Sequence, residues 1–178
     1  TTNFVKGLPH FSVSIAIRVK GRTEVGVVYD PIRNELFTAV RGEGAKLNDL
    51  RLRVENKRDL SGAVLATGFP FKQAKYMPMQ FRMMESLIQE VADFRRTGSA
   101  ALDLCYVAAG RVDGYFEYGI KAWDVAAGDL IVREAGGIVT DYHAGHGYLK
   151  AGHIVAAAPR VLKDMLNKIQ PCLAEDLK

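Results

Sequence analysis

Hydrophobic and polar residues alternate strictly along residues 11–19, with the sequence FSVSIAIRV. A period of two residues is typical of a β-strand that turns one face toward the core. Similar apolar runs over 24–29 and 35–40 follow turn sequences at 21–22 and 30–34, which are rich in Gly, Pro, Asn and Asp. Three strands joined by short turns predict an antiparallel meander.

The rest of the chain alternates strand-like and helix-like segments. Short apolar runs predict strands over 63–67, 114–118, 138–142 and 153–157. Apolar residues at helical spacing, or capped apolar runs, predict helices over 79–92, 100–109, 124–135 and 159–169. No repeat or long linker interrupts the series, so residues 1–178 are expected to form a single domain of α/β or α+β class, built in layers.

Composition narrows the class of protein. The chain is 48% hydrophobic and 25% charged, as in ordinary globular proteins, and no apolar run is long enough to cross a membrane. The formal charge of +4 suits a small anionic substrate, but the basic residues are scattered and do not indicate nucleic-acid binding. Two isolated cysteines in 178 residues favour a reducing, cytoplasmic location.

The run 123–128, WDVAAG, carries a carboxylate, Asp124, where a helix is expected to begin. Small residues behind Asp124 would let that helix lie close to a sheet. An acid at this position can cap the helix or can bind a hard cation such as Mg²⁺, which prefers carboxylate oxygens. The local pattern favours the capping interpretation but does not exclude the metal ligand.

Two other segments carry candidate chemistry. Ser99, preceded by Gly98, stands at the start of the helix expected over 100–109. It is either an ordinary N-cap or part of an anion site made by free backbone N–H groups, and the two are equally plausible from the pattern. Glu117 lies in an aromatic strand, where it either meets solvent or accepts hydrogen bonds from polyol hydroxyls.

Taken together, these segments resemble the inositol monophosphatase family, and most closely its bacterial inositol-1-monophosphatase branch. The resemblance rests on TTNF at 1–4, FRRTGSAA at 94–101, GYFE at 114–117, WDVAAG at 123–128 and EAGG at 134–137. It extends over the whole chain and implies the sandwich of helices and sheets shared with fructose-1,6-bisphosphatases. The WDVAAG motif alone indicates only the superfamily.

The resemblance also implies a site. A phosphate monoester would be hydrolysed with Mg²⁺ as cofactor, and Asp124 would be both a metal ligand and a catalytic residue. Thr1 would contact the phosphate and the attacking water. Gly98, Ser99 and Ala100 would line the substrate pocket with Asp124, and Glu117 would bind inositol hydroxyls.

In the family, the sequence TTNF follows Asp-Pro-x-Asp-Gly, which supplies further metal ligands. We therefore expect residues 1–178 to be the C-terminal two-thirds of such an enzyme, to lack most metal ligands and to have little phosphatase activity alone. We also expect them to expose apolar surface where upstream helices would pack, and the complete protein to be a homodimer.

Two alternatives to an inositol phosphatase remain open. One is a sugar phosphatase of the fructose-1,6-bisphosphatase type. The other is a non-catalytic role, because bacterial relatives are partners of the transcription-antitermination machinery. In that case the partners would be transcription elongation factors, with the phosphatase fold serving as a scaffold.

Overall fold

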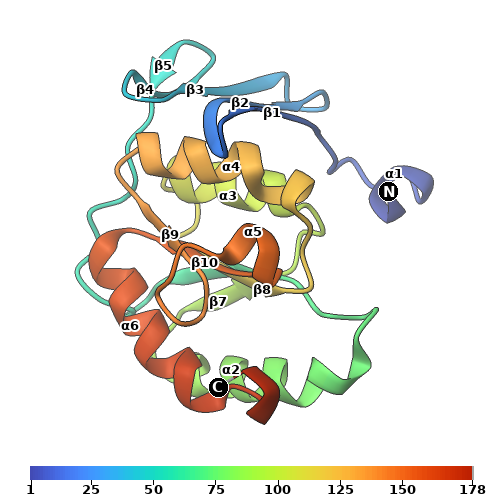
Figure 1. Ribbon diagram of the computed structural model, residues 1–178, viewed down its shortest axis with the longest axis vertical. Helices are drawn as coiled ribbons and strands as arrows, with labels where there is room; N and C mark the ends of the chain where they lie inside the picture. The colour runs from blue at the N-terminus through green and yellow to red at the C-terminus, as the bar shows by residue number, and fades with distance from the viewer. Residues whose placement is uncertain (178) are drawn as a thin grey trace.

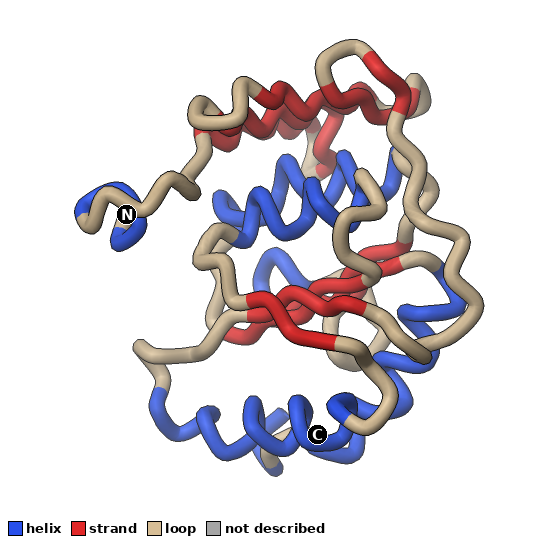
Figure 2. Tube along the Cα trace, turned by 180° about the vertical axis from the view of Figure 1, so that it is seen from behind, coloured by secondary structure: helices blue, strands red, loops and turns tan. Residues whose placement is uncertain are grey.

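A computed structural model of the protein describes residues 1–177, which form alternating layers of sheet and helix (Figure 1). A first sheet is followed by the helix pair α3 and α4, then by a second sheet, and then by helices α2 and α6. The view from behind shows the same order, with one helix pair held between the two sheets (Figure 2). This arrangement confirms the predicted layered α/β class.

The first sheet is an antiparallel meander, as the sequence predicts. Its strands follow the order of the chain: β1 (Val13–Val19), β2 (Arg22–Asp30), β3 (Glu35–Val40), β4 (Gly44–Leu47) and β5 (Leu50–Arg51). Strands β4 and β5 were not expected, because the sequence after β3 reads as a turn. The predicted turn is present but covers only residues 41–43, because Gly44 already pairs with Val40 at the start of β4.

The alternation in β1 is present, but the apolar face is the exposed one. Val13, Ile15 and Ile17 are each about half exposed, whereas Ser14 and Ala16 face inward. The expectation that the apolar face of this strand lies in the core is therefore wrong for the described residues. Exposed apolar surface is thus present, as expected, whereas its covering by upstream helices stays a prediction.

Close contact between the first sheet and α4 explains why small residues face inward. A Cβ atom on Gly26 of β2 would lie 2.8 Å from the carbonyl oxygen of Ala127 in α4. On the neighbouring side of α4, a Cβ on Gly128 would lie 2.7 Å from Leu104 of α3. The small residues of the WDVAAG run thus allow α4 to pack tightly against both neighbours, as predicted. The bounds of the two helices are α3 (Ala100–Ala108) and α4 (Ala122–Glu134).

The second sheet has mixed strand directions. Its order is β7 (Asp93–Arg95), β6 (Val64–Thr67), β8 (Gly114–Tyr118), β10 (His153–Ala157) and β9 (Ile138–Thr140). Strand β6 runs parallel to β7 and β8, whereas β10 runs antiparallel to β8 and β9. The short edge strand β7 was not expected, because three residues are too few to show a period. The other four strands were predicted within two residues at each end.

Helices α2 (Met77–Ile88) and α6 (Pro159–Ile169) cover the outer face of the second sheet (Figure 1). They enclose a second apolar core, separate from the core around α3 and α4. Short helices complete the fold: α1 (Thr2–Val5), α5 (Tyr148–Ala151) and the 3-10 turns η1 (Ala74–Tyr76), η2 (Gln170–Cys172) and η3 (Glu175–Leu177). Within residues 1–177, no helix has the length and apolar character needed to cross a membrane.

Candidate functional site

A cavity of about 460 Å³ opens where the N-terminal segment, the loop before α3 and the start of α4 meet. All of the residues predicted for the site line it: Thr1, Gly98, Ser99, Ala100, Glu117 and Asp124. These residues come from three parts of the chain that are far apart in the sequence: the N-terminus, the loop before α3, and the stretch from β8 to the start of α4. The structure therefore brings the predicted set together around one space, while their individual roles stay predictions.

Asp124 occupies the third position of α4, which begins two residues earlier than predicted. Its Oδ2 atom accepts a hydrogen bond of 2.9 Å from the backbone N–H of Lys121, the residue before the helix. The capping interpretation is thus correct. Asp124 also lines the cavity, and its Oδ1 atom accepts no hydrogen bond from the described residues. One carboxylate can therefore stabilise the helix start and still present an oxygen to a cation.

Glu117 is positioned by β8 and is only partly exposed. The buried hydroxyl of Tyr115 donates a hydrogen bond of 2.6 Å to its Oε2 atom. Burial raises the pKa of the Glu117 carboxyl, and the nearby charge of Asp124 acts in the same direction, whereas Tyr115 and Arg96 oppose the shift. The carboxyl group is thus fixed in place, not mobile in solvent.

Room for Glu117 depends on Gly68, a residue that the sequence indicates only as the end of a strand. A Cβ atom on Gly68 would lie 2.2 Å from the carboxyl carbon of Glu117. No side chain fits at position 68 unless Glu117 moves. Gly68 is therefore a site residue that sequence reasoning missed.

The loop before α3 brings three of the predicted residues to the cavity. Ser99 is the N-cap of α3, and its hydroxyl accepts the backbone N–H of Leu102 at 3.4 Å. Gly98 has a φ of +89°, in the left-handed region that favours glycine. A Cβ there would also lie 2.9 Å from a guanidinium nitrogen of Arg96. The capping interpretation of Ser99 is confirmed. Glycine at position 98 allows the left-handed backbone conformation and leaves room for the Arg96 side chain.

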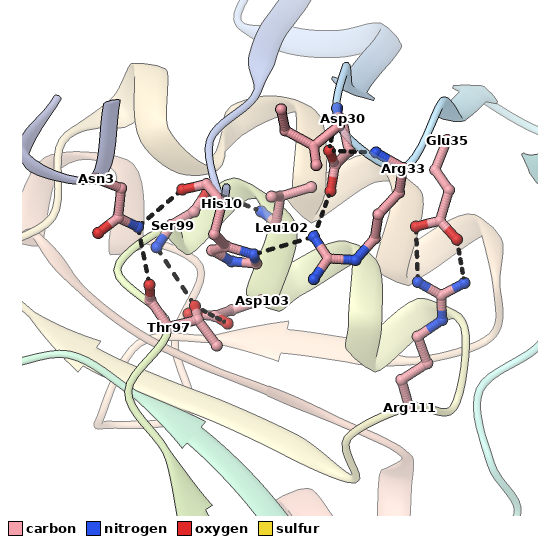
Figure 3. A network of polar contacts seen from close by, with 11 residues as sticks. Asn3, His10, Asp30, Arg33, Glu35, Thr97, Ser99, Leu102, Asp103 and Arg111 are labelled. Carbon is pink, nitrogen blue, oxygen red and sulfur yellow. Dashed lines mark hydrogen bonds and ion pairs between the residues drawn. The ribbon is translucent and has the colours of Figure 1, made fainter. Parts of the chain in front are cut away.

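The N-terminal segment is tied to this loop by Asn3 (Figure 3). The side-chain amide of Asn3 donates to the carbonyl oxygens of Thr97, at 3.0 Å, and His10, at 2.8 Å. Thr1 lies two residues before Asn3 and lines the cavity. Thr1, the residue predicted to contact the phosphate, thus lines the same cavity as Gly98 and Ser99.

Asp103 is a second residue that the sequence did not single out. It is buried in α3, lines the cavity and accepts a hydrogen bond of 2.6 Å from the Thr97 hydroxyl (Figure 3). Burial raises the pKa of the Asp103 carboxyl to about 7; the charge of Glu117 adds to the shift, and Thr97 and Arg96 oppose it. The signal available in the sequence was a single acid, Asp103, within an otherwise apolar predicted helix.

A chain of polar contacts continues from the site to the first sheet (Figure 3). Arg33 lies 3.5 Å from the His10 ring and forms an ion pair of 3.0 Å with the buried carboxylate of Asp30 at the end of β2. Burial lowers the pKa of His10, and the charge of Arg33 acts in the same direction. These contacts hold the wall of the cavity against the first sheet.

Among the described residues, the cavity wall carries the carboxylates of Glu117 and Asp124, and the buried acid Asp103 with its pKa raised to about 7, against the single guanidinium of Arg96. A negative wall suits a cation and hydroxyl groups better than a bare phosphate. However, residues 1–177 contain no group of three or more Asp, Glu, His or Cys side chains arranged to hold a metal ion. Asp124 therefore fits the role of one magnesium ligand, and the described residues do not complete a metal cluster.

Comparison with known proteins agrees with this geometry. The sequence profile of the inositol monophosphatase family matches residues 1–175. Nus factor SuhB of Pasteurella multocida is 81% identical over 178 residues, which are 100% of this chain and 67% of that protein. The chain thus spans about two thirds of the length of this relative.

Solved structures give the same result. The crystal structure of the extragenic suppressor protein SuhB from Bartonella henselae superposes with a TM-score of 0.92 at 44% identity, covering 96% of this chain and 65% of that one. Inositol monophosphatase from Anabaena superposes with a TM-score of 0.91 at 37% identity, covering 100% and 74%. The chain belongs to the inositol monophosphatase family.

Proposed function

We propose that the protein of which residues 1–178 form the matched part is a Mg²⁺-dependent phosphatase that hydrolyses inositol monophosphate to inositol and phosphate. The observation that carries the proposal is the convergence of Asp124, Glu117 and the loop 98–100 on one cavity. A carboxylate for the cation, a fixed carboxylate for hydroxyl groups and the backbone N–H groups at the start of α3 suit a phosphorylated polyol.

Each residue then has a distinct task. Asp124 holds the cation through the oxygen that does not cap α4. Gly98, Ser99 and Ala100 border the phosphorylated end of the substrate, and Thr1 contacts the phosphate and the attacking water. Glu117 accepts hydrogen bonds from hydroxyl groups of the leaving alcohol. When bound, magnesium neutralises phosphate charge and lowers the pKa of a water molecule.

Because Asp124 can supply only one ligand of a metal cluster, we propose that the other metal ligands come from outside residues 1–177. Hydrolysis of a phosphate monoester without a catalyst is among the slowest reactions known, and much of the catalytic task falls on charge neutralisation. Residues 1–178 alone should therefore release little phosphate from inositol 1-phosphate, even with added Mg²⁺.

The decisive experiment measures phosphate release from inositol 1-phosphate by residues 1–178 and by a full-length relative of high identity, with Mg²⁺ and with EDTA. Activity is expected only in the longer protein and only with Mg²⁺. Activity of residues 1–178 near that of the longer protein would refute the proposed need for outside ligands. A parallel assay on fructose 1,6-bisphosphate decides between the proposal and a sugar phosphatase.

We also propose, as a second candidate, association with the transcription-antitermination machinery. The supporting observation is the 81% identity to a protein named as a Nus factor. A pull-down with transcription elongation factors, using the Asp124→Asn form of the full-length protein, tests this role. Retained binding together with lost hydrolysis would separate the two functions, and no binding by either form would exclude the second. Light scattering of the full-length protein tests the homodimer that the family resemblance implies.

A further inference from the structure

Tyr115 is a buried tyrosine that lies beside the candidate site without lining it. It belongs to β8, the middle strand of the second sheet, and pairs with Ala66 of β6 and Ala156 of β10. Its side chain is fully buried, and Tyr115 is not among the described residues that line the active-site cavity. Any effect of Tyr115 on a ligand in that cavity must therefore pass through another residue.

That other residue is Glu117, which does line the cavity. Residues two apart in a strand point to the same face of the sheet, and the Tyr115 hydroxyl donates a hydrogen bond of 2.6 Å to Oε2 of Glu117. Burial raises the pKa of the Tyr115 phenol well above its usual value, so the hydroxyl keeps its proton and acts as a donor at neutral pH. Hydrogen bonds to ionised acceptors are among the strongest in proteins.

This bond gives the two carboxylate oxygens of Glu117 different surroundings. Oε2 accepts the Tyr115 hydroxyl, whereas Oε1 accepts no hydrogen bond from residues 1–177. Gly68 lies against the same carboxyl group, since a Cβ atom there would be 2.2 Å from Oε1 and 2.3 Å from Oε2. Close packing and one strong hydrogen bond thus restrict the carboxyl group and leave Oε1 for a ligand.

The bond to Glu117 is not simply what a buried phenol requires. Buried tyrosine hydroxyls usually find a partner, and a contact of this kind can serve the fold alone. Tyr142, however, is also fully buried, and its hydroxyl has no hydrogen-bond partner among the described residues. The fold therefore accommodates a buried phenol that is unpaired, and the pairing of Tyr115 with a cavity carboxylate is a specific feature of the site.

We propose that Tyr115 is a positioning residue, whose hydroxyl holds the Glu117 carboxyl group so that Oε1 accepts a hydroxyl of the substrate. Tyr115 would thereby set the preference for phosphate esters of polyols over esters whose alcohol has no further hydroxyl group. The kinetic consequence rests on the proposed function. The placement of the carboxyl group by Tyr115 does not.

The kinetic test compares Tyr115→Phe with the parent in the full-length protein, with Mg²⁺. The variant should raise KM for inositol 1-phosphate about five- to tenfold and change kcat by less than about twofold. Both constants for 4-nitrophenyl phosphate, which offers no alcohol hydroxyl, should stay the same and show that the variant is folded. In a Glu117→Ala background, Tyr115→Phe should raise KM no further. Tyr142→Phe is the matched control, because it removes a buried hydroxyl that has no described partner, and should leave both substrates unaffected.

A crystal structure of the full-length Tyr115→Phe variant gives a readout that does not depend on activity. The Glu117 carboxyl group should leave the position that it holds in the parent. An unmoved carboxyl group would overturn the inference, and so would an equal rise in KM for both substrates or a rise that persists without Glu117. Failure of the parent to hydrolyse inositol 1-phosphate would instead refute the proposed function, and the crystal structure would still decide the role of Tyr115.

Discussion

Gly68 lies directly against the carboxyl group of Glu117, so close that a Cβ atom at position 68 would be 2.2 Å from the carboxyl carbon. The two residues come from neighbouring strands of the second sheet, because Gly68 follows β6 and Glu117 belongs to β8. The absence of a side chain at Gly68 thus leaves the room that the proposed hydroxyl-binding carboxylate of Glu117 occupies.

Gly68→Ala should push Glu117 out of place and lower the free energy of unfolding by about 1–3 kcal/mol, the usual result of overpacking. In the full-length protein it should also raise KM for inositol 1-phosphate. Urea unfolding and steady-state kinetics measure the two effects. In a Glu117→Ala background, where the carboxyl group is gone, Gly68→Ala should cost less than half as much. An equal cost in both backgrounds would contradict the contact.

Asp103→Asn should change how stability depends on pH. The folded-state pKa of Asp103 is about 7, above the ordinary value of 3.8. The folded protein therefore keeps a proton that the unfolded chain releases, so this group makes stability fall as pH rises from about 4 to about 7. Asparagine cannot ionise, and its amide oxygen can still accept the Thr97 hydroxyl.

The variant should therefore gain stability relative to the parent as pH rises, by about 1–4 kcal/mol between pH 4 and pH 8. Urea unfolding at intervals of one pH unit measures the slope. Some slope should remain, because burial also raises the pKa of Glu117. Asp49→Asn, a substitution at an exposed acid, is the control. Parallel profiles for parent and Asp103→Asn would show that the carboxyl group is not protonated in the fold.

Asp124→Asn and Glu117→Gln should have different kinetic effects in the full-length protein. Asparagine can still accept the Lys121 N–H, so α4 and the overall stability should change little. Loss of the charged metal ligand should nevertheless lower kcat by about a thousandfold, which corresponds to about 4 kcal/mol. Glu117→Gln should mainly change the ratio of KM values among substrates that differ in their hydroxyl groups. An unchanged rate for Asp124→Asn would remove Asp124 from the proposed metal site.

The exposed apolar face of β1 should cause residues 1–178 to self-associate. Val13, Ile15 and Ile17 share this face with Val25 and Val27 of β2, which pair with β1 in register. Ile15→Lys/Ile17→Lys should shift the apparent mass toward that of a monomer in size-exclusion chromatography with light scattering. Leu50→Lys, which replaces an exposed apolar residue of β5, should not have this effect. Self-association that persists in the double variant would place the contact on another face.

The sequence alone determined the local elements. Period-two alternation and turn residues specified the meander, and a compact apolar run with Ser99 as its cap specified α3, because each pattern reflects contacts between residues close in the chain. Local pattern singled out Asp124, Ser99 and Glu117 as candidates, and the family resemblance added Thr1 and Ala100 and implied a role for each. The short strands β5 and β7, with two and three residues, were missed because such segments carry too little periodicity.

Only the tertiary structure decided which surfaces and side chains meet. It turned the apolar face of β1 outward, because close contact with α4 leaves room only for small residues on the inner face. It also placed Gly68 against Glu117 and Asp103 in the cavity wall. These relationships join residues distant in sequence, and close packing and charge act through space, so no local pattern could have specified them.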